Sequence, residues 1–119
     1  MEQVMKLLIV EDNIGMRRLI KSVVFDLADE IFECEDGADA LTAYTNFHPD
    51  WVLMDIEMPK VDGLVSTHNI IEKFPQANIC IVTDYNDQKT INAAYEAGAK
   101  GYVHKENLYL VRDILLTKH

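Results

Sequence analysis

Short apolar runs alternate with stretches of helical periodicity along the chain. Four or five consecutive apolar residues are typical of a strand buried on both faces, whereas apolar residues three and four positions apart indicate a helix buried on one side. The expected strands cover residues 6–10, 31–35, 51–54, 78–82 and 101–104. The expected helices follow them, with apolar positions spanning residues 16–27, 40–47, 63–74, 87–97 and 108–115.

This (βα)5 pattern predicts an α/β fold with a doubly wound, five-stranded parallel sheet, because each parallel connection must cross over a face of the sheet. Strand 31–35 alternates apolar and acidic residues and therefore belongs at an edge. The apolar strands 6–10, 51–54 and 78–82 belong at the centre. This distribution is compatible with the strand order 2-1-3-4-5.

Several residues mark where the helices begin and end. Asp36 and Asn107 are expected to cap the second and the last helix, while Pro75 and Gly98 end the third and the fourth. The apolar face of the first helix is expected to comprise Met16, Leu19, Ile20, Val23, Val24 and Leu27.

Composition limits the class of protein. The chain has 119 residues, of which 49% are apolar, so we expect one domain over residues 1–119 with its own core. No apolar run approaches the ~20 residues that cross a membrane, and the first residues lack the layout of a signal peptide. We therefore expect a cytoplasmic protein without membrane contact, in which Cys34 and Cys80 are buried free thiols. The net charge of -9 argues against direct nucleic-acid binding.

Polar residues follow four of the five strands directly. Glu11 and Asp12 follow the first strand, Asp55 the third, Thr83 the fourth and Lys105 the fifth. The carboxyl ends of parallel strands share one edge of the sheet, so these side chains should meet in one crevice. Taken alone, Asp55 could be a metal ligand, a base, a nucleophile or a residue of the chain reversal.

The group of residues narrows these roles for Asp55. Three carboxylates close together repel one another unless a cation intervenes. Oxygen ligands suit Mg2+, which retains waters and accepts a phosphate oxygen. With Lys105 as a further positive charge and Thr83 as a hydroxyl donor, the pattern predicts a phosphoryl site with Asp55 as the attacking carboxylate.

Three motifs resemble the receiver domain of response regulators in two-component signalling. They lie at residues 8–13 (LIVEDN), 53–59 (LMDIEMP, followed by Asp62-Gly63) and 97–105 (AGAKGYVHK). The similarity extends over essentially the whole chain. It implies a flavodoxin-like sheet with the order 2-1-3-4-5.

The resemblance also implies roles for individual residues. Asp55 would accept a phosphoryl group from a histidine kinase or a phosphotransfer protein, in contact with Thr83 and Lys105. Mg2+, or Mn2+ in its place, would be held by Glu11, Asp12, Asp55 and the backbone carbonyl of Glu57. Inward movement of Thr83 would let Tyr102 rotate inward. The chain would thus be a switch that assists its own phosphorylation and dephosphorylation, without being an enzyme in the usual sense.

The resemblance further implies which surface carries the signal. The fourth helix, the fifth strand and the fifth helix would form a face whose affinity for a downstream protein or a fused output domain changes on phosphorylation. A homodimer through the same face is compatible with this interpretation. Any output domain would lie outside residues 1–119.

Two positions depart from the pattern of the family. Asp84 follows Thr83 where a small residue is more common, and a carboxylate there should repel a phosphodonor or an attacking water. We expect Glu57, Asp84 and Tyr85 to tune the rates of phosphorylation and dephosphorylation. Glu106 follows Lys105 in place of the usual proline, so we expect a trans peptide bond between them.

Three other functions are alternatives to a phosphorylated receiver domain. A haloacid-dehalogenase-type phosphatase places its nucleophile after the first strand, in an Asp-x-Asp pattern, which this chain lacks. A flavodoxin-like cofactor binder needs a loop rich in Gly, Ser and Thr after that strand, where the chain is acidic. The third alternative is a receiver-like module that is regulated without phosphorylation.

Overall fold

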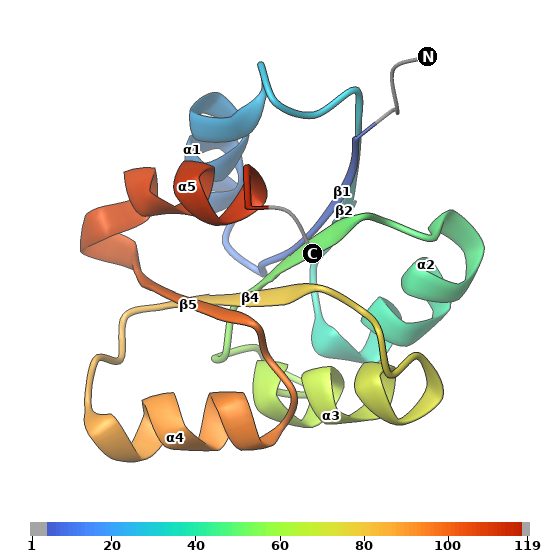
Figure 1. Ribbon diagram of the computed structural model, residues 1–119, viewed down its shortest axis with the longest axis vertical. Coiled ribbons are helices and arrows are strands. Elements are labelled where there is room, and N and C mark those ends of the chain that lie inside the picture. Colours follow the sequence, from blue (N-terminus) through green and yellow to red (C-terminus); the bar gives the residue numbers. More distant parts are fainter. Residues whose placement is uncertain (1–4, 118–119) are drawn as a thin grey trace.

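The computed structural model describes residues 5–117, in which a parallel sheet is covered by helices on both faces (Figure 1). The strand order β2-β1-β3-β4-β5 and the parallel pairing confirm the predicted doubly wound fold. The strands are β1 (Lys6–Val10), β2 (Glu30–Cys34), β3 (Trp51–Met54), β4 (Ile79–Thr83) and β5 (Gly101–His104).

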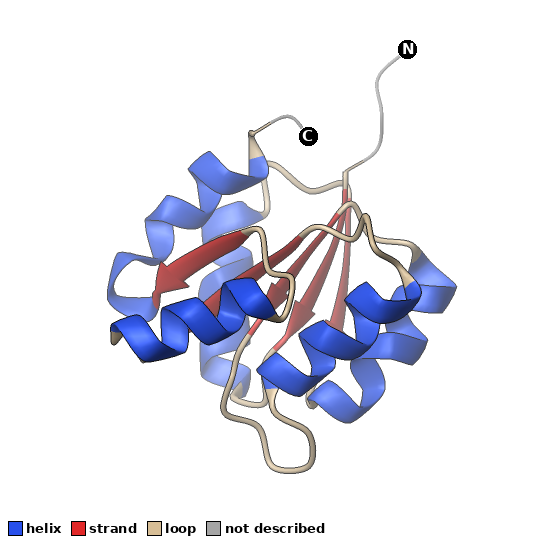
Figure 2. Ribbon diagram, turned by 60° about the horizontal axis from the view of Figure 1, so that its bottom comes forward, coloured by secondary structure: helices blue, strands red, loops and turns tan. Residues whose placement is uncertain are grey.

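Helices fill the connections between the strands, as Figure 2 shows. The α-helices are α1 (Ile14–Val24), α2 (Ala40–Phe47), α3 (Gly63–Lys73), α4 (Gln88–Glu96) and α5 (Val111–Leu115). Two 3-10 helices, η1 (Gly37–Asp39) and η2 (Lys105–Leu110), precede α2 and α5. Within residues 5–117, none of these helices is long and apolar enough to cross a membrane.

The sheet separates two apolar cores. Leu8 and Val10 of β1 face α2, α3 and α4 together with residues such as Ile70, whereas Leu7 and Ile9 face α1 and α5. Successive residues of a strand point to opposite faces, so a strand in the middle of the sheet must be apolar throughout. This is why β1, β3 and β4 appear in the sequence as uninterrupted apolar runs.

The edge strand and the two cysteines also match their predictions. β2 pairs only with β1 among the described strands, and most of its side chains are exposed or half-buried. Cys34 and Cys80 are buried free thiols. Burial raises the pKa of Cys34 to about 11 and that of Cys80 to about 12, so both thiols stay protonated and unreactive near neutral pH.

Three predictions about helices are wrong in detail. Asn107 does not cap the last helix, because its backbone is non-helical within η2 and α5 begins only at Val111. The apolar spacing of residues 108, 111 and 115 fits a 3-10 turn followed by a short α-helix equally well. Leu19 is 49% exposed, and Leu27 packs on the core from beyond the end of α1. Helical periodicity locates an apolar stripe, but it fixes neither its width nor the end of the helix.

Candidate functional site

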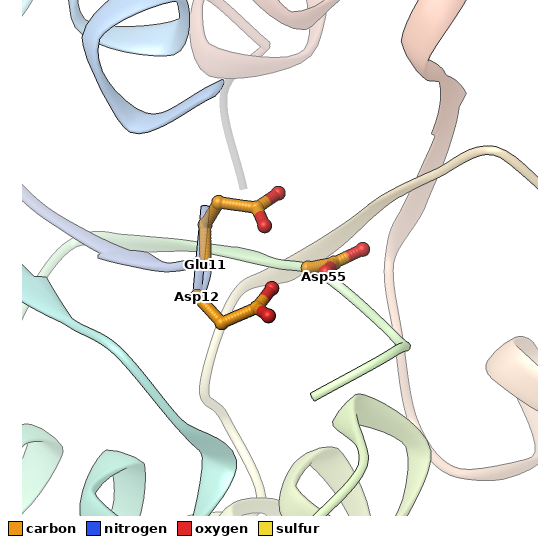
Figure 3. Close-up of side chains that lie close together, drawn as sticks. All are labelled: Glu11, Asp12 and Asp55. Atoms are coloured by element: carbon orange, nitrogen blue, oxygen red, sulfur yellow. The ribbon is translucent and has the colours of Figure 1, made fainter. Parts of the chain in front are cut away.

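The predicted site residues meet in a crevice of about 440 Å³ at the carboxyl edge of the sheet. β1 ends directly before Glu11 and Asp12, and β3 directly before Asp55. Figure 3 shows the Glu11 and Asp12 carboxylates extending toward the side on which Asp55 lies. The lining residues are Glu11, Asp12, Asn13, Met16, Asp55, Glu57, Thr83, Asp84, Tyr85 and Lys105.

Lys105 bridges two of the carboxylates. Its Nζ lies 2.9 Å from Glu11 Oε1 and 3.1 Å from Asp55 Oδ1, and all three side chains are largely buried. Burial alone would lower the pKa of Lys105, but its hydrogen bond to Glu11 and the charge of Asp55 prevail and raise that pKa. The ammonium group is therefore charged at neutral pH and partly neutralises the two acids.

The acids remain poorly solvated despite this cation. Burial raises the pKa of Glu11 to about 7, although the hydrogen bonds from Lys105 and the backbone of Asn13 act in the opposite direction. Burial also raises the pKa of Asp55, against the attraction of Lys105. A second positive charge close to them would favour the ionised form of both carboxylates.

The donor set suits a hard divalent cation. One carboxylate oxygen from each of Glu11, Asp12 and Asp55 can be chosen so that all three lie within 4.8 Å of one another. Mg2+ binds oxygen ligands in an octahedron and usually retains several waters. Glu11 and Asp55 are buried while Asp12 is exposed, so an ion among them could keep part of its water shell.

Thr83 and Tyr102 occupy different places relative to the crevice. Thr83 ends β4, is only 1% exposed and lines the crevice. Its Oγ1 accepts a hydrogen bond from the backbone N–H of Tyr85 at 3.3 Å. Tyr102 lies outside the lining, and its hydroxyl donates to the backbone carbonyl of Tyr85 at 2.6 Å. The two side chains are therefore linked through the loop between β4 and α4.

The residues expected to tune the rates lie at the mouth of the crevice. Asp84 is exposed there, and the hydroxyl of Tyr85 donates a short hydrogen bond to the Glu57 carboxylate. This bond raises the pKa of Tyr85. It also connects the loop after β3 with the loop after β4. No peptide bond among the described residues is cis, so the Lys105–Glu106 bond is trans as predicted.

Arg17 holds the backbone of Glu11 in place, a role that the sequence analysis did not identify. It is 7% exposed on the buried face of α1, and its NH1 group donates to the carbonyl of Glu11 at 2.8 Å. Its Nε donates to Glu33 of β2 at 3.1 Å. The sequence contained one sign of this role, because Arg17 is a charged residue three positions before Ile20 and so lies inside the apolar stripe of the helix.

The loop after β3 is held by Asp36 and Gly63. The carboxylate of Asp36 caps η1, the 3-10 turn that precedes α2, and not α2 itself as predicted. It also accepts from the backbone N–H groups of Lys60 and Val61 at 2.9 and 3.0 Å. A Cβ at Gly63 would lie 1.8 Å from the carbonyl oxygen of Asp55, so only glycine fits there. The motif at residues 53–59, with Asp62-Gly63 after it, indicated Gly63 in the sequence. No local pattern revealed that Asp36 also binds the loop after β3.

Comparison with known proteins identifies the family of the chain. Residues 7–111 match the response regulator receiver domain. The chain is 37% identical over 102 residues to the chemotaxis protein CheY of Listeria monocytogenes, covering 85% of this chain and 86% of that protein. It is 36% identical over 105 residues to the uncharacterized transcriptional regulatory protein YhcZ of Bacillus subtilis, covering 86% of this chain. The chain spans only 49% of the length of YhcZ.

Solved structures show the same fold. A LuxR-family response regulator from Aurantimonas superposes with a TM-score of 0.84 at 27% identity, over 95% of this chain and 86% of that one. The chemotaxis protein CheY4 of Vibrio cholerae superposes with a TM-score of 0.85 at 22% identity, over 96% of this chain and 100% of that one. The match over residues 7–111, together with these relatives, shows that the chain belongs to the response regulator receiver domain family.

Proposed function

We propose that Asp55 accepts a phosphoryl group from the phosphohistidine of a sensor kinase or a phosphotransfer protein. An Asp55 carboxylate oxygen forms a bond to phosphorus while the bond from phosphorus to the imidazole nitrogen of the donor breaks. The imidazole keeps the electron pair and then takes up a proton. The observation that carries this proposal is the buried contact of Asp55 with Lys105, beside the acid pair Glu11 and Asp12.

The crevice supplies electrostatic help for this transfer. Lys105 lies where it can neutralise a phosphoryl oxygen, and the Thr83 hydroxyl can donate to another. Glu11, Asp12, Asp55 and the backbone carbonyl of Glu57 would hold Mg2+, or Mn2+ in its place. The bound ion would supply positive charge to the carboxylates and to the transferring group.

The signal is proposed to leave the crevice through Thr83 and Tyr102. A phosphoryl group adds roughly -1.5 to -2 charges and strong acceptor oxygens, so it can draw the Thr83 hydroxyl toward Asp55. That movement changes the loop on which the Tyr102 hydroxyl rests. Tyr102 would then turn inward and alter the face formed by α4, β5 and α5.

We propose this face as the contact surface for a downstream protein or a fused output domain. A homodimer would form through the same face. Three expectations stay predictions: a cytoplasmic location, a single receiver domain over residues 1–119, and no nucleic-acid binding by this domain.

Glu57, Asp84 and Tyr85 are proposed to set the lifetime of the phosphoryl group. All three line the crevice, and Glu57 and Asp84 bring negative charge to the path of an incoming donor or water. Replacing Asp84 with Ala should therefore accelerate phosphorylation, dephosphorylation or both. The measurement is the rate of each step with acetyl phosphate and Mg2+. Unchanged rates of both steps would refute a role for Asp84.

The central experiment tests the phosphoacceptor itself. The protein is incubated with acetyl phosphate and Mg2+, and its mass is measured before and after. We expect a gain of one phosphoryl group that is absent in Asp55→Asn. Continuous turnover of varied phosphate esters would instead support a phosphatase. A protein that gains no mass with an intact site would support regulation without phosphorylation.

A further inference from the structure

The side chain of His104 joins the two loops that flank the crevice. Thr83 and His104 are register partners at the carboxyl end of the β4–β5 pair. The His104 side chain is 18% exposed. Its Nε2 lies 2.8 Å from the carbonyl oxygen of Asp84, and its Nδ1 lies 3.2 Å from the backbone nitrogen of Glu106.

These two contacts fix the tautomer of the ring. The backbone N–H of Glu106 can only donate, so Nδ1 must be an unprotonated acceptor. The carbonyl of Asp84 can only accept, so Nε2 must carry the proton. His104 thus uses both ring nitrogens, each toward a different loop.

His104 and Tyr102 act on the same loop from the same face of β5. They are two residues apart, so their side chains point to one side of the strand. Tyr102 holds the carbonyl of Tyr85, and His104 holds the preceding carbonyl, that of Asp84. Two neighbouring carbonyls of the loop after β4 are therefore tied to β5, next to Thr83.

The other nitrogen of His104 acts on the turn that presents Lys105. η2 begins at Lys105, and His104 is its N-terminal cap through the bond from Glu106. The cap satisfies a backbone donor at the start of the turn, where no carbonyl partner is available within the helix. The position of the Lys105 backbone is thus connected through one side chain to the loop that begins at Asp84, directly after Thr83.

We propose that His104 is a positioning residue that holds the loop after β4 in its unphosphorylated arrangement and couples it to the Lys105 turn. This inference rests on the proposed function for its consequence, because Thr83 can follow a phosphoryl group only if its loop moves. Moving that loop strains or breaks the bond between His104 and the Asp84 carbonyl. Loss of His104 should then favour the phosphorylated arrangement.

The tautomer is the first test and needs no variant. Nitrogen NMR of the imidazole ring in the wild-type protein at about pH 7.5 should show protonated Nε2 and unprotonated Nδ1. His68 is a suitable internal reference, because its ring is exposed on α3 and its Nε2 lies beside the exposed carboxylate of Glu72 in the next turn. Protonation at Nδ1 of His104 would overturn the proposal.

The second test measures how strongly the loop after β4 is held, by amide hydrogen exchange. In His104→Leu, amide hydrogen exchange of residues 84–87 and of Glu106 should be roughly 2- to 10-fold faster than in wild type, as expected for the loss of one net hydrogen bond at each site. His68→Leu should leave these amides unchanged. His104→Gln, which keeps a donor near the position of Nε2, should restore slow exchange in the loop after β4. If His104→Leu and His68→Leu exchange alike, the tether does not exist.

The third test measures the consequence for activation. Beryllofluoride, a tetrahedral analogue of the phosphoryl group, is titrated with saturating Mg2+. His104→Leu should bind it roughly 2- to 10-fold more tightly than wild type. Equal or weaker binding would overturn the holding role. A wild-type protein that does not bind beryllofluoride would contradict the proposed function of Asp55, while the exchange experiment would still decide whether His104 ties the loop.

Discussion

Replacing Lys105 with Met removes the cation that contacts both Glu11 and Asp55. The two carboxylates are left with side-chain exposures of 2% and 6% and lose partners at 2.9 and 3.1 Å. Removing one partner of a fully buried ion pair typically costs about 3–5 kcal/mol. The crevice opens to water at Asp12 and the carboxylates can take up protons, so we expect a loss of about 2–3 kcal/mol in the free energy of unfolding.

The assay is urea unfolding in metal-free buffer at about pH 7.5, with and without saturating Mg2+. A loss of this size corresponds to a fall in melting temperature of roughly 10 °C for a domain of this length. Mg2+ should narrow the difference, because the ion supplies positive charge at the same carboxylates and stabilises the variant more than the wild type.

Lys100→Met is the matched control for the loss of a lysine. Its Nζ binds the carbonyl of Gln76 and the side chain of Asn78 at the surface, so its loss should cost less than about 1 kcal/mol. Equal losses in the two variants would refute the electrostatic reasoning. A loss in Lys105→Met that Mg2+ leaves unchanged would refute the assignment of the metal to these carboxylates.

Three further predictions concern the carboxylates and the loop that holds Asp55. Burial raises the pKa of Glu11 to about 7, so the protonated carboxyl contributes stability that is complete below about pH 4.5 and is lost as pH rises through about 7. Because a metal ion binds the deprotonated carboxylate, calorimetry should show Mg2+ affinity rising roughly tenfold from pH 6 to pH 8. A Mg2+ affinity that does not change with pH would contradict this. Asp36→Ala should lower the free energy of unfolding by about 2–3 kcal/mol in urea, because three backbone N–H groups lose their acceptor, and a loss below about 0.5 kcal/mol would count against it. Gly63→Ala should lower the free energy of unfolding by more than about 3 kcal/mol, because its Cβ would meet the Asp55 carbonyl at 1.8 Å. Gly15→Ala is the control and should cost far less, because the nearest neighbour of its Cβ is a side-chain oxygen at 3.2 Å. Equal losses in the two variants would refute the steric argument.

The sequence predicts the position of the crevice well because topology gathers the strand ends. Once β1, β3, β4 and β5 are recognised as apolar runs in a parallel sheet, the residues that follow them must share one edge. Asp55 and Lys105 are separated by about half the chain, yet they lie 3.1 Å apart for this reason. Residues at which the chain turns after a strand, such as Gly63, add local evidence for where that strand ends.

The supporting contacts could not be predicted in the same way. Arg17 binds a backbone carbonyl of the loop directly before its helix, and Asp36 and His104 bind backbone groups of loops that are distant in the sequence. A backbone carbonyl or amide leaves no pattern in the sequence. Asp36 and the backbone of Lys60 are 24 residues apart, and their contact depends on how η1 packs beside the loop after β3. Loop conformation depends on packing, which hydrophobic periodicity does not encode.

The charge of the crevice explains why Asp55 should depend on a metal ion. Among residues 5–117, five carboxylates line it (Glu11, Asp12, Asp55, Glu57 and Asp84), against one cation, Lys105. A phosphodonor carries further negative charge and would be repelled until a divalent ion enters. Phosphotransfer itself needs only some of these acids, so the acids at the mouth, Glu57 and Asp84, add negative charge beyond that need. Because both acids are exposed and line the crevice, we expect them to set how quickly the phosphoryl group is gained and lost as much as Asp55 itself does.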